Sequence, residues 1–116
     1  MIIHGKDIRF KLTVGASGEI ADLCPDRDIA KIGDLLSGSY CDSIITTEKF
    51  CRILNKWYVR FEKYAGRKAD SLDEGELLTL EPDDYKQLLD EAMRAFGSDA
   101  KTDIKGEPTK KATKGE

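Results

Sequence analysis

The chain has 116 residues and a mass of 13.0 kDa, with 40% hydrophobic and 35% charged residues, which fits a single globular domain. The mean hydropathy is -0.48, and no apolar run approaches the roughly 18 residues of a spanning helix, which excludes a membrane protein. Charged residues come too soon after the N-terminus for a signal peptide, so we expect a cytoplasmic protein. The net charge of -3 argues against a globally basic nucleic-acid binder, and three cysteines without an export signal indicate reduced thiols.

The first thirteen residues predict a β-hairpin of two short strands. Apolar and polar residues alternate from residue 8 to residue 13, which is typical of a half-buried strand. His4 and Gly5 interrupt the preceding apolar pair, and both residue types tolerate the positive φ of a tight turn. An isolated hairpin is only marginally stable, so one face of this one is expected to lie on other elements.

Residues 14–37 predict two short helices separated by Pro25. Proline disfavours helical geometry at the residue before it and is tolerated in a first helical turn, so the second helix is expected to restart near Asp26. The segment Ser37-Gly38-Ser39 is expected to end it.

Residues 47–65 carry the strongest helical signal. Apolar residues recur there at three- and four-residue spacing, over an arc wide enough to pack into a core. Gly66 is the expected C-terminal stop, and Thr46 or Thr47 is the expected N-terminal cap. The apolar positions are Phe50, Cys51, Ile53, Leu54, Trp57, Tyr58, Phe61, Tyr64 and Ala65.

The C-terminal half begins with an acidic stretch, residues 70–76, and a short apolar run. A last helix is predicted from Pro82 to Phe96, because proline and two aspartates suit a helix start, and Gly97 is the expected stop. Residues 98–116 contain one large apolar residue and are expected to be disordered.

The fold class that these elements predict is α+β and mainly helical. An N-terminal β-hairpin, about four helices and a disordered C-terminal tail are expected. Residues 1–97 form the single globular domain in this prediction, and residues 98–116 form the tail.

The residues that most often carry chemistry show no catalytic or metal-binding spacing. The one histidine, His4, lies in a predicted turn, and Cys24, Cys41 and Cys51 form no C-x-x-C pattern. Cys24 and Cys51 are interpreted as small core residues, and Cys41 as more exposed. We therefore expect no metal, no cofactor and no enzymatic activity.

Charge segregation is the most informative feature of the sequence. Residues 48–68 hold seven basic and two acidic residues, whereas residues 69–97 hold two basic and nine acidic ones. Five cations share one face of the 47–65 helix, and we call them the basic stripe: Lys49, Arg52, Lys56, Arg60 and Lys63. Four carboxylates form what we call the acidic segment: Asp70, Asp73, Glu74 and Glu76.

Three interpretations of the basic stripe stay open. It is an ordinary solvated helix face; it pairs with an acidic segment of the same chain, a second copy or another protein; or it binds nucleic acid. Nucleic acid is the least favoured, because the adjacent acidic block repels phosphate. Trp57 is expected in the core, and an exposed Trp57 would instead mark an anchor for a partner.

Short apolar and turn motifs carry a resemblance to a known family. Residues 2–15 (IIHGKDIRFKLTVG), the aromatic-rich middle helix, and residues 80–96, which open with LEPDDY and close with AMRAF, together resemble the small tail assembly chaperones of long-tailed bacteriophages and prophages. The resemblance implies a non-enzymatic protein of the bacterial host cytoplasm. Its implied partners are the tape-measure protein, the tail-tube protein and further copies of itself.

The resemblance also suggests a use for the segregated charges. Weak, repeated contacts along a long client give avidity without high affinity at one site. Our hypothesis is that the basic stripe of one copy meets the acidic segment of the next. The alternative function is a small phage or bacterial regulator that binds nucleic acid through the same stripe.

Overall fold

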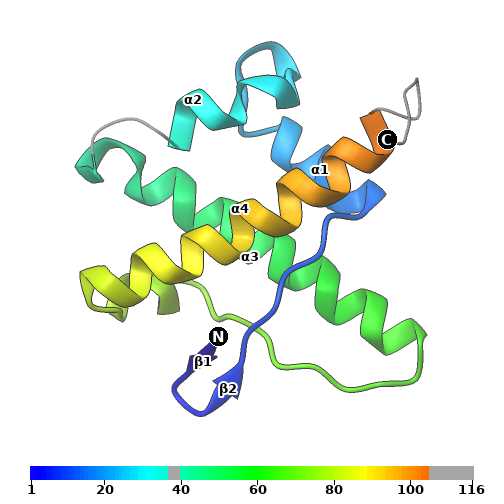
Figure 1. Ribbon diagram of the computed structural model, residues 1–116, viewed down its shortest axis with the longest axis vertical. Coiled ribbons are helices and arrows are strands. Elements are labelled where there is room, and N and C mark those ends of the chain that lie inside the picture. Colours follow the sequence, from blue (N-terminus) through cyan, green and yellow to red (C-terminus); the bar gives the residue numbers. More distant parts are fainter. Residues whose placement is uncertain (37–39, 105–116) are drawn as a thin grey trace.

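The computed structural model describes residues 1–36 and 40–104 and confirms the predicted fold class, a mainly helical α+β domain with an N-terminal hairpin. The longest helix, α3, occupies the centre: α1 and α2 pack against it, and α4 crosses it (Figure 1). No helix in the described part of the chain is long and apolar enough to cross a membrane. The helices are α1 (Val14–Ala21), α2 (Ile32–Leu36), α3 (Tyr40–Tyr64) and α4 (Pro82–Ile104).

The hairpin consists of β1 (Ile2–Ile3) and β2 (Lys6–Asp7), paired antiparallel with Ile3 opposite Lys6. His4 and Gly5 form the turn, with φ of 50° and 80°. Two successive positive φ angles are what a two-residue turn between twisted strands requires, so the predicted turn is confirmed.

The hairpin is shorter than predicted: Ile8 still exchanges two backbone hydrogen bonds with Met1, at 2.9 and 3.0 Å, but residues 9–13 belong to no strand. They run extended along α3, where the Lys11 amide donates to the Leu54 carbonyl oxygen at 3.2 Å. Ile8 and Leu12 are buried, so the alternation is real. It reflects a segment lying on a helix, which the sequence pattern does not distinguish from a strand.

The connection between α1 and α2 follows the prediction in part. Thr13 caps α1, its hydroxyl accepting from the Ala16 amide at 3.1 Å, and α1 ends before Pro25 as predicted. The restart near Asp26 is wrong, because Asp26 has φ 56° and lies in the first of two short 3₁₀ turns. These turns are η1 (Pro25–Arg27) and η2 (Ile29–Lys31), and α2 follows directly. The predicted stop at residues 37–39 lies outside the described residues.

Helix α3 begins seven residues before the predicted start. Thr46 and Thr47 are therefore not caps; Thr47 is fully buried inside the helix. The predicted stop at Gly66 is confirmed: it has φ 82°, and the Arg67 amide returns to the Glu62 carbonyl oxygen at 2.8 Å. A glycine in this conformation ends a helix because it turns the chain without a steric penalty.

Beyond α3, an extended segment leads to the 3₁₀ turn η3 (Glu76–Thr79) and to α4. Pro82 begins α4 as predicted, but the expected stop at Gly97 is wrong, since α4 continues to Ile104. Glycine inside a helix costs only about 1 kcal/mol, which a long helix tolerates. The expected tail from residue 98 therefore starts inside a helix, and its residues 105–116 lie outside the described part.

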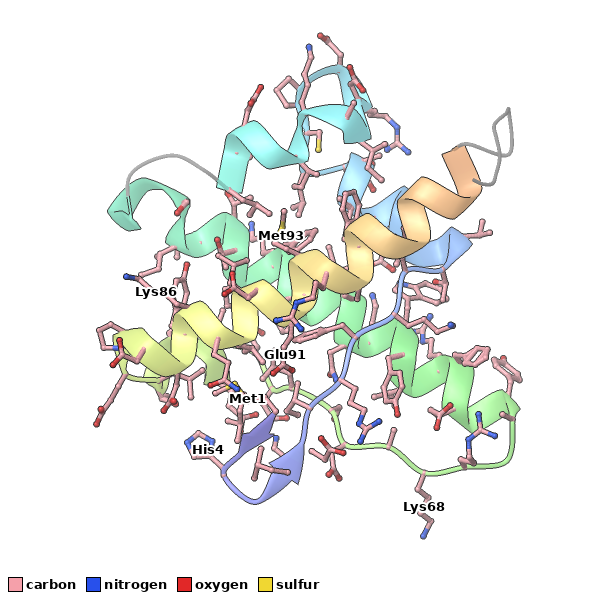
Figure 2. All side chains as sticks on the ribbon, viewed as in Figure 1. Met1, His4, Lys68, Lys86, Glu91 and Met93 are labelled. Carbon is pink, nitrogen blue, oxygen red and sulfur yellow. The ribbon has the colours of Figure 1, made fainter. Side chains whose placement is uncertain are left out.

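The core forms where α1, α2, α4 and the extended segments meet α3. Phe50 and Leu54 of α3 are fully buried, and Phe50 meets Phe96 of α4 edge to face, with ring centroids 5.6 Å apart. Cys24 and Cys51 are buried in this core, as predicted. Figure 2 shows Met93 of α4 near the centre of the molecule and Lys68 and Lys86 pointing away from it.

Candidate functional site

The basic stripe forms the floor of a groove along α3. The groove has a volume of about 670 Å³, and all five cations of the stripe line it. Glu19 of α1 and Leu23, just after α1, form one wall, and residues 71–74 form the other. Ile53 and Val59 add apolar surface between the cations. The prediction that the five cations share a face is confirmed.

Two cations of the stripe have partners within the chain. Arg52 binds Glu48 through two hydrogen bonds of 2.6 and 3.1 Å, which raise the pKa of Arg52. Glu48 also accepts from the Gly75 amide at 3.0 Å and so joins α3 to the chain before η3. Lys56 reaches both carboxylate oxygens of Glu19, at 2.6 and 2.8 Å. These two cations therefore serve the fold as well as the groove.

Glu19 ties the groove wall to the floor. Its carboxylate accepts from the Trp57 indole nitrogen at 2.9 Å in addition to Lys56. Burial alone raises the pKa of Glu19, but the hydrogen bonds from Lys56 and Trp57 outweigh it and leave that pKa lowered. The carboxylate thus stays charged and holds the indole in place.

The other three cations remain open to a partner. Lys49 and Lys63 are exposed, and neither has a carboxylate partner among the residues that the structure describes. The Arg60 guanidinium lies 4.7 Å from the centre of the Trp57 ring, a cation–π contact that orients it without neutralising its charge.

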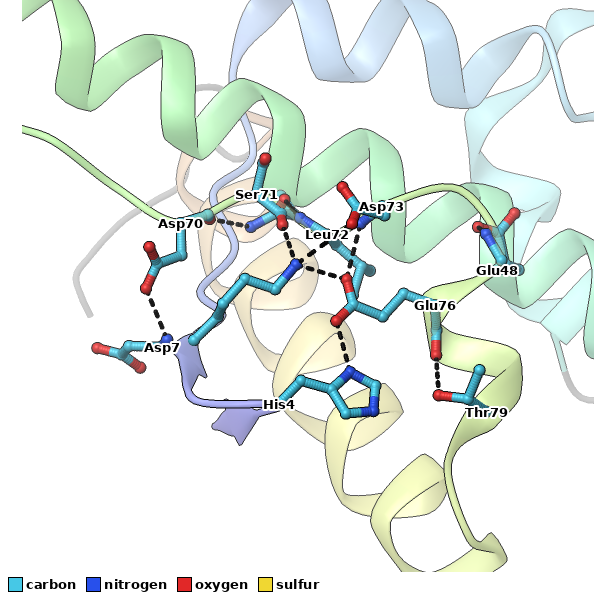
Figure 3. A network of polar contacts seen from close by, with 12 residues as sticks. His4, Asp7, Glu48, Asp70, Ser71, Leu72, Asp73, Glu76 and Thr79 are labelled. Atoms are coloured by element: carbon cyan, nitrogen blue, oxygen red, sulfur yellow. Dashed lines mark hydrogen bonds and ion pairs between the residues drawn. The ribbon is translucent and has the colours of Figure 1, made fainter.

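The acidic segment divides between the groove and the hairpin. Asp73 and Glu74 are exposed on the groove wall. Asp70 accepts from the Asp7 amide at 2.9 Å, and Glu76 accepts from Lys6 at 2.6 Å (Figure 3). Contact of this segment with a second copy stays a prediction, in which Asp73 and Glu74 are the accessible groups.

Glu76 is the centre of the network that holds the hairpin. Its second oxygen lies 2.6 Å from His4 Nδ1, and Lys6 also donates to the Ser71 carbonyl oxygen at 2.8 Å. Burial alone raises the pKa of Glu76, but the hydrogen bonds from His4 and Lys6 outweigh it and lower the pKa from its ordinary 4.5 to about 2. The hairpin is therefore anchored by charge to the chain before α4.

This lowered pKa predicts a specific loss of stability in acid. Because the folded pKa lies below the unfolded one, the stabilisation is fully present above about pH 4.5 and disappears as the pH falls towards about 2. Glu76→Gln is expected to lower the free energy of unfolding by about 1.5 to 3 kcal/mol at pH 7 and to show a weaker acid dependence. Urea unfolding from pH 7 to pH 3 measures both effects. Glu81→Gln, an exposed neighbour, is the control; equal pH profiles for the two variants would contradict the assignment.

The sequence did not reveal the role of Asn55, a buried polar side chain of α3. It is 1% exposed and donates to the carbonyl oxygens of Arg9 and Asp70, at 3.0 and 3.3 Å. Its own amide oxygen accepts from the Leu72 amide at 2.6 Å. Asn55 thus binds both extended segments to α3; the available signal was a lone polar residue at the edge of the apolar arc.

An apolar hollow of about 360 Å³ lies at the end of α3. Arg60 lines both the groove and the hollow, so the two adjoin at this residue. Phe61 is 43% and Tyr64 91% exposed, although both were predicted in the apolar face of the helix. We call this site the aromatic hollow; its lining residues are Thr13, Trp57, Arg60, Phe61, Tyr64 and Ala65.

Trp57 lies partly buried between the core and the aromatic hollow. Its ring packs on Gly15 of α1 so closely that a Cβ atom there would come within 2.4 Å of the ring. The Lys11 ammonium lies 4.6 Å from the centre of the neighbouring Phe61 ring. Cations therefore border the aromatic side chains of this hollow.

The groove and the aromatic hollow are suited to binding a ligand. The buried thiols of Cys24 and Cys51, in contrast, are poor nucleophiles. Burial raises the pKa of both Cys24 and Cys51, whereas the reactive form of cysteine is the thiolate. No group of three or more metal-ligating side chains gathers within the described residues.

No protein-family model, curated protein or solved structure matches this chain.

Proposed function

We propose that this protein is a non-enzymatic tail assembly chaperone of a long-tailed bacteriophage or prophage. It self-associates in the bacterial cytoplasm, holds the tape-measure protein and brings tail-tube subunits to it. The resemblance of residues 2–15 and 80–96 suggests this role, and the surface of α3 supports it.

The observation that carries the proposal is the track formed by the groove and the aromatic hollow, which adjoin at Arg60. It follows α3 from Lys49 to Ala65, a length of roughly 24 Å at 1.5 Å per residue. Open cations line the floor, and exposed aromatic rings lie at one end. Such a track suits a helix of a client that presents acidic residues beside apolar ones.

The charges in the track favour protein over nucleic acid. Glu19, Asp73 and Glu74 line the same groove and would repel a phosphate backbone. Stacking of successive bases would need several free ring faces, but Lys11 stands over Phe61 and Arg60 over Trp57, which leaves only Tyr64 among the rings of the hollow. A polypeptide with mixed charge suits these surroundings better.

Co-expression with the neighbouring genes tests the function. If they encode a very long helical protein and a tail-tube protein, the chain is expected to co-purify with the long protein and keep it in solution. A neighbourhood without such genes, or a long helical protein that precipitates regardless of this chain, would overturn the proposal. Salt-sensitive retention of random duplex DNA would favour the nucleic-acid regulator instead.

Charge reversal in the groove tests the site separately. Lys49→Glu with Lys63→Glu is expected to weaken client binding by about tenfold or more, because both cations are open and neither holds the fold. Arg52 and Lys56 are poorer targets, since their internal partners would be lost. Binding is measured by titration at low and high salt. The control is Lys86→Glu on α4, at an exposed residue that does not line the groove; equal weakening by the control would reject the groove.

A further inference from the structure

The aromatic hollow has the composition of a binding pocket for an apolar side chain. Tyr64, at 91% exposure, and the half-exposed Phe61 present large apolar surface to water, as residues at the centre of an interface do. The hollow is open and borders Thr13, where α1 is capped.

The positive charges at the rim of the aromatic hollow determine which ligand it favours. Lys11 and Arg60 stand over the rings of the hollow, and Lys63 lies in the adjoining groove. The nearest carboxylate of α3, Glu62, is engaged by Arg67 at 2.7 and 2.9 Å. The matching ligand is therefore an exposed apolar side chain followed by acidic residues.

The chain itself presents such a group. Leu78 in η3 is 46% exposed, and the exposed carboxylates Glu81, Asp83 and Asp84 follow it within six residues. Glu81 precedes α4 and the two aspartates lie in its first turn, which fixes their direction relative to Leu78. We call this group the Leu78 knob.

The knob and the hollow of one molecule lie too far apart to meet. In Figure 1, η3 and the start of α4 lie at the left of the molecule, and the end of α3 lies at the right. The knob of one copy can therefore reach only the hollow of another. Where the contact is not exchanged reciprocally about a two-fold axis, two different surfaces join copies head to tail, and a parent oligomer that stops at a dimer would show the reciprocal form.

We propose that the aromatic hollow receives Leu78 of a second copy, with Glu81, Asp83 and Asp84 of that copy meeting Lys11, Arg60 and Lys63. The inference rests on the self-association in the proposed function and assigns its surfaces. The segment 105–116 of the chain is a poorer occupant, because it contains four lysines and no large apolar residue. The product is a row of copies in which each hollow is filled by a neighbour, and the part of the groove lined by Lys49, Arg52 and Lys56 is left for a client.

Sedimentation velocity of the full chain at low salt tests the contact. The parent chain is expected to form oligomers that grow with concentration and dissociate in high salt. Tyr64→Asp and Leu78→Asp are each expected to weaken self-association by at least about tenfold, by placing a charge in the contact. Both residues are exposed, so circular dichroism should show an unchanged fold.

Mixing the two variants gives the decisive result. Tyr64→Asp keeps an intact knob and Leu78→Asp keeps an intact hollow. An equimolar mixture is therefore expected to form dimers and nothing larger, because only this one knob and this one hollow can join. A mixture that stays monomeric, or a single variant that assembles like the parent, would overturn the contact. Ile45→Asp, at another exposed apolar residue of α3, is expected to assemble normally; the same loss there would also overturn it.

Client binding separates this contact from the proposed function. A chain that remains monomeric but keeps the long helical protein in solution overturns the knob-and-hollow contact and leaves the chaperone function standing. If the variants form the expected mixed dimer but the parent chain does not bind the client, the result supports the contact and contradicts the proposed function.

Discussion

Replacing Asn55 with alanine is expected to lower the free energy of unfolding by about 3 to 5 kcal/mol, because three hydrogen bonds are lost and their buried partners stay unpaired. Urea unfolding followed by circular dichroism measures the change. Asn55→Asp keeps an acceptor for the Leu72 amide but places a negative charge beside two carbonyl oxygens, so it is expected to be no more stable than the alanine variant.

A matched control for Asn55 lies on the same helix. Lys49→Ala removes an exposed side chain and is expected to change stability by no more than about 0.5 kcal/mol. If Asn55→Ala and Lys49→Ala unfold at the same urea concentration, Asn55 does not join the two extended segments to α3 as described.

Two glycines of α1 are expected to respond in opposite directions to alanine. Gly15→Ala forces a Cβ atom to within 2.4 Å of Trp57, whose indole is also held by Glu19, and is expected to cost about 1 to 3 kcal/mol. Gly18→Ala meets nothing within 4 Å and is expected to add about 0.5 to 1 kcal/mol through helix propensity.

Thermal unfolding measures both glycine variants, and fluorescence reports the cause. Trp57 is the only tryptophan, so a change in its emission in Gly15→Ala, absent in Gly18→Ala, places the strain at the indole. Equal stability changes in the two variants would show that Gly15 does not limit the approach of α1 to α3.

The periodic spacing of apolar residues predicted the long helices, whereas residues typical of helix caps predicted the helix ends less well. The apolar spacing around Phe50 and Leu54 is dense enough to indicate a helix, and Gly66 ends it because a positive φ is needed there. The start of α3 was missed because a threonine inside a helix looks the same in sequence as a threonine at its cap. Gly97 was misread because glycine ends a helix only when the chain must turn.

The stripe of the candidate site could be predicted, but its surroundings could not. Five cations at helical spacing share a face in any α-helix that contains them. The partners Glu19 and Gly75 come from elements 37 and 27 residues away in sequence from Lys56 and Glu48, and spacing says nothing of such contacts. The exposure of Tyr64 was also hidden, because no pattern shows that α3 extends past the elements that would cover it.

The joining of two extended segments on α3 has a consequence for the order of folding. Asn55 contacts a carbonyl group 46 residues before it, and Glu76 contacts a lysine 70 residues before it. Closing such long loops costs entropy before their contacts form, so we expect the helices to form first and the hairpin to dock last. By the same reasoning the hairpin is the unit that detaches first in the native state, and its amides should exchange with solvent ahead of those in α3.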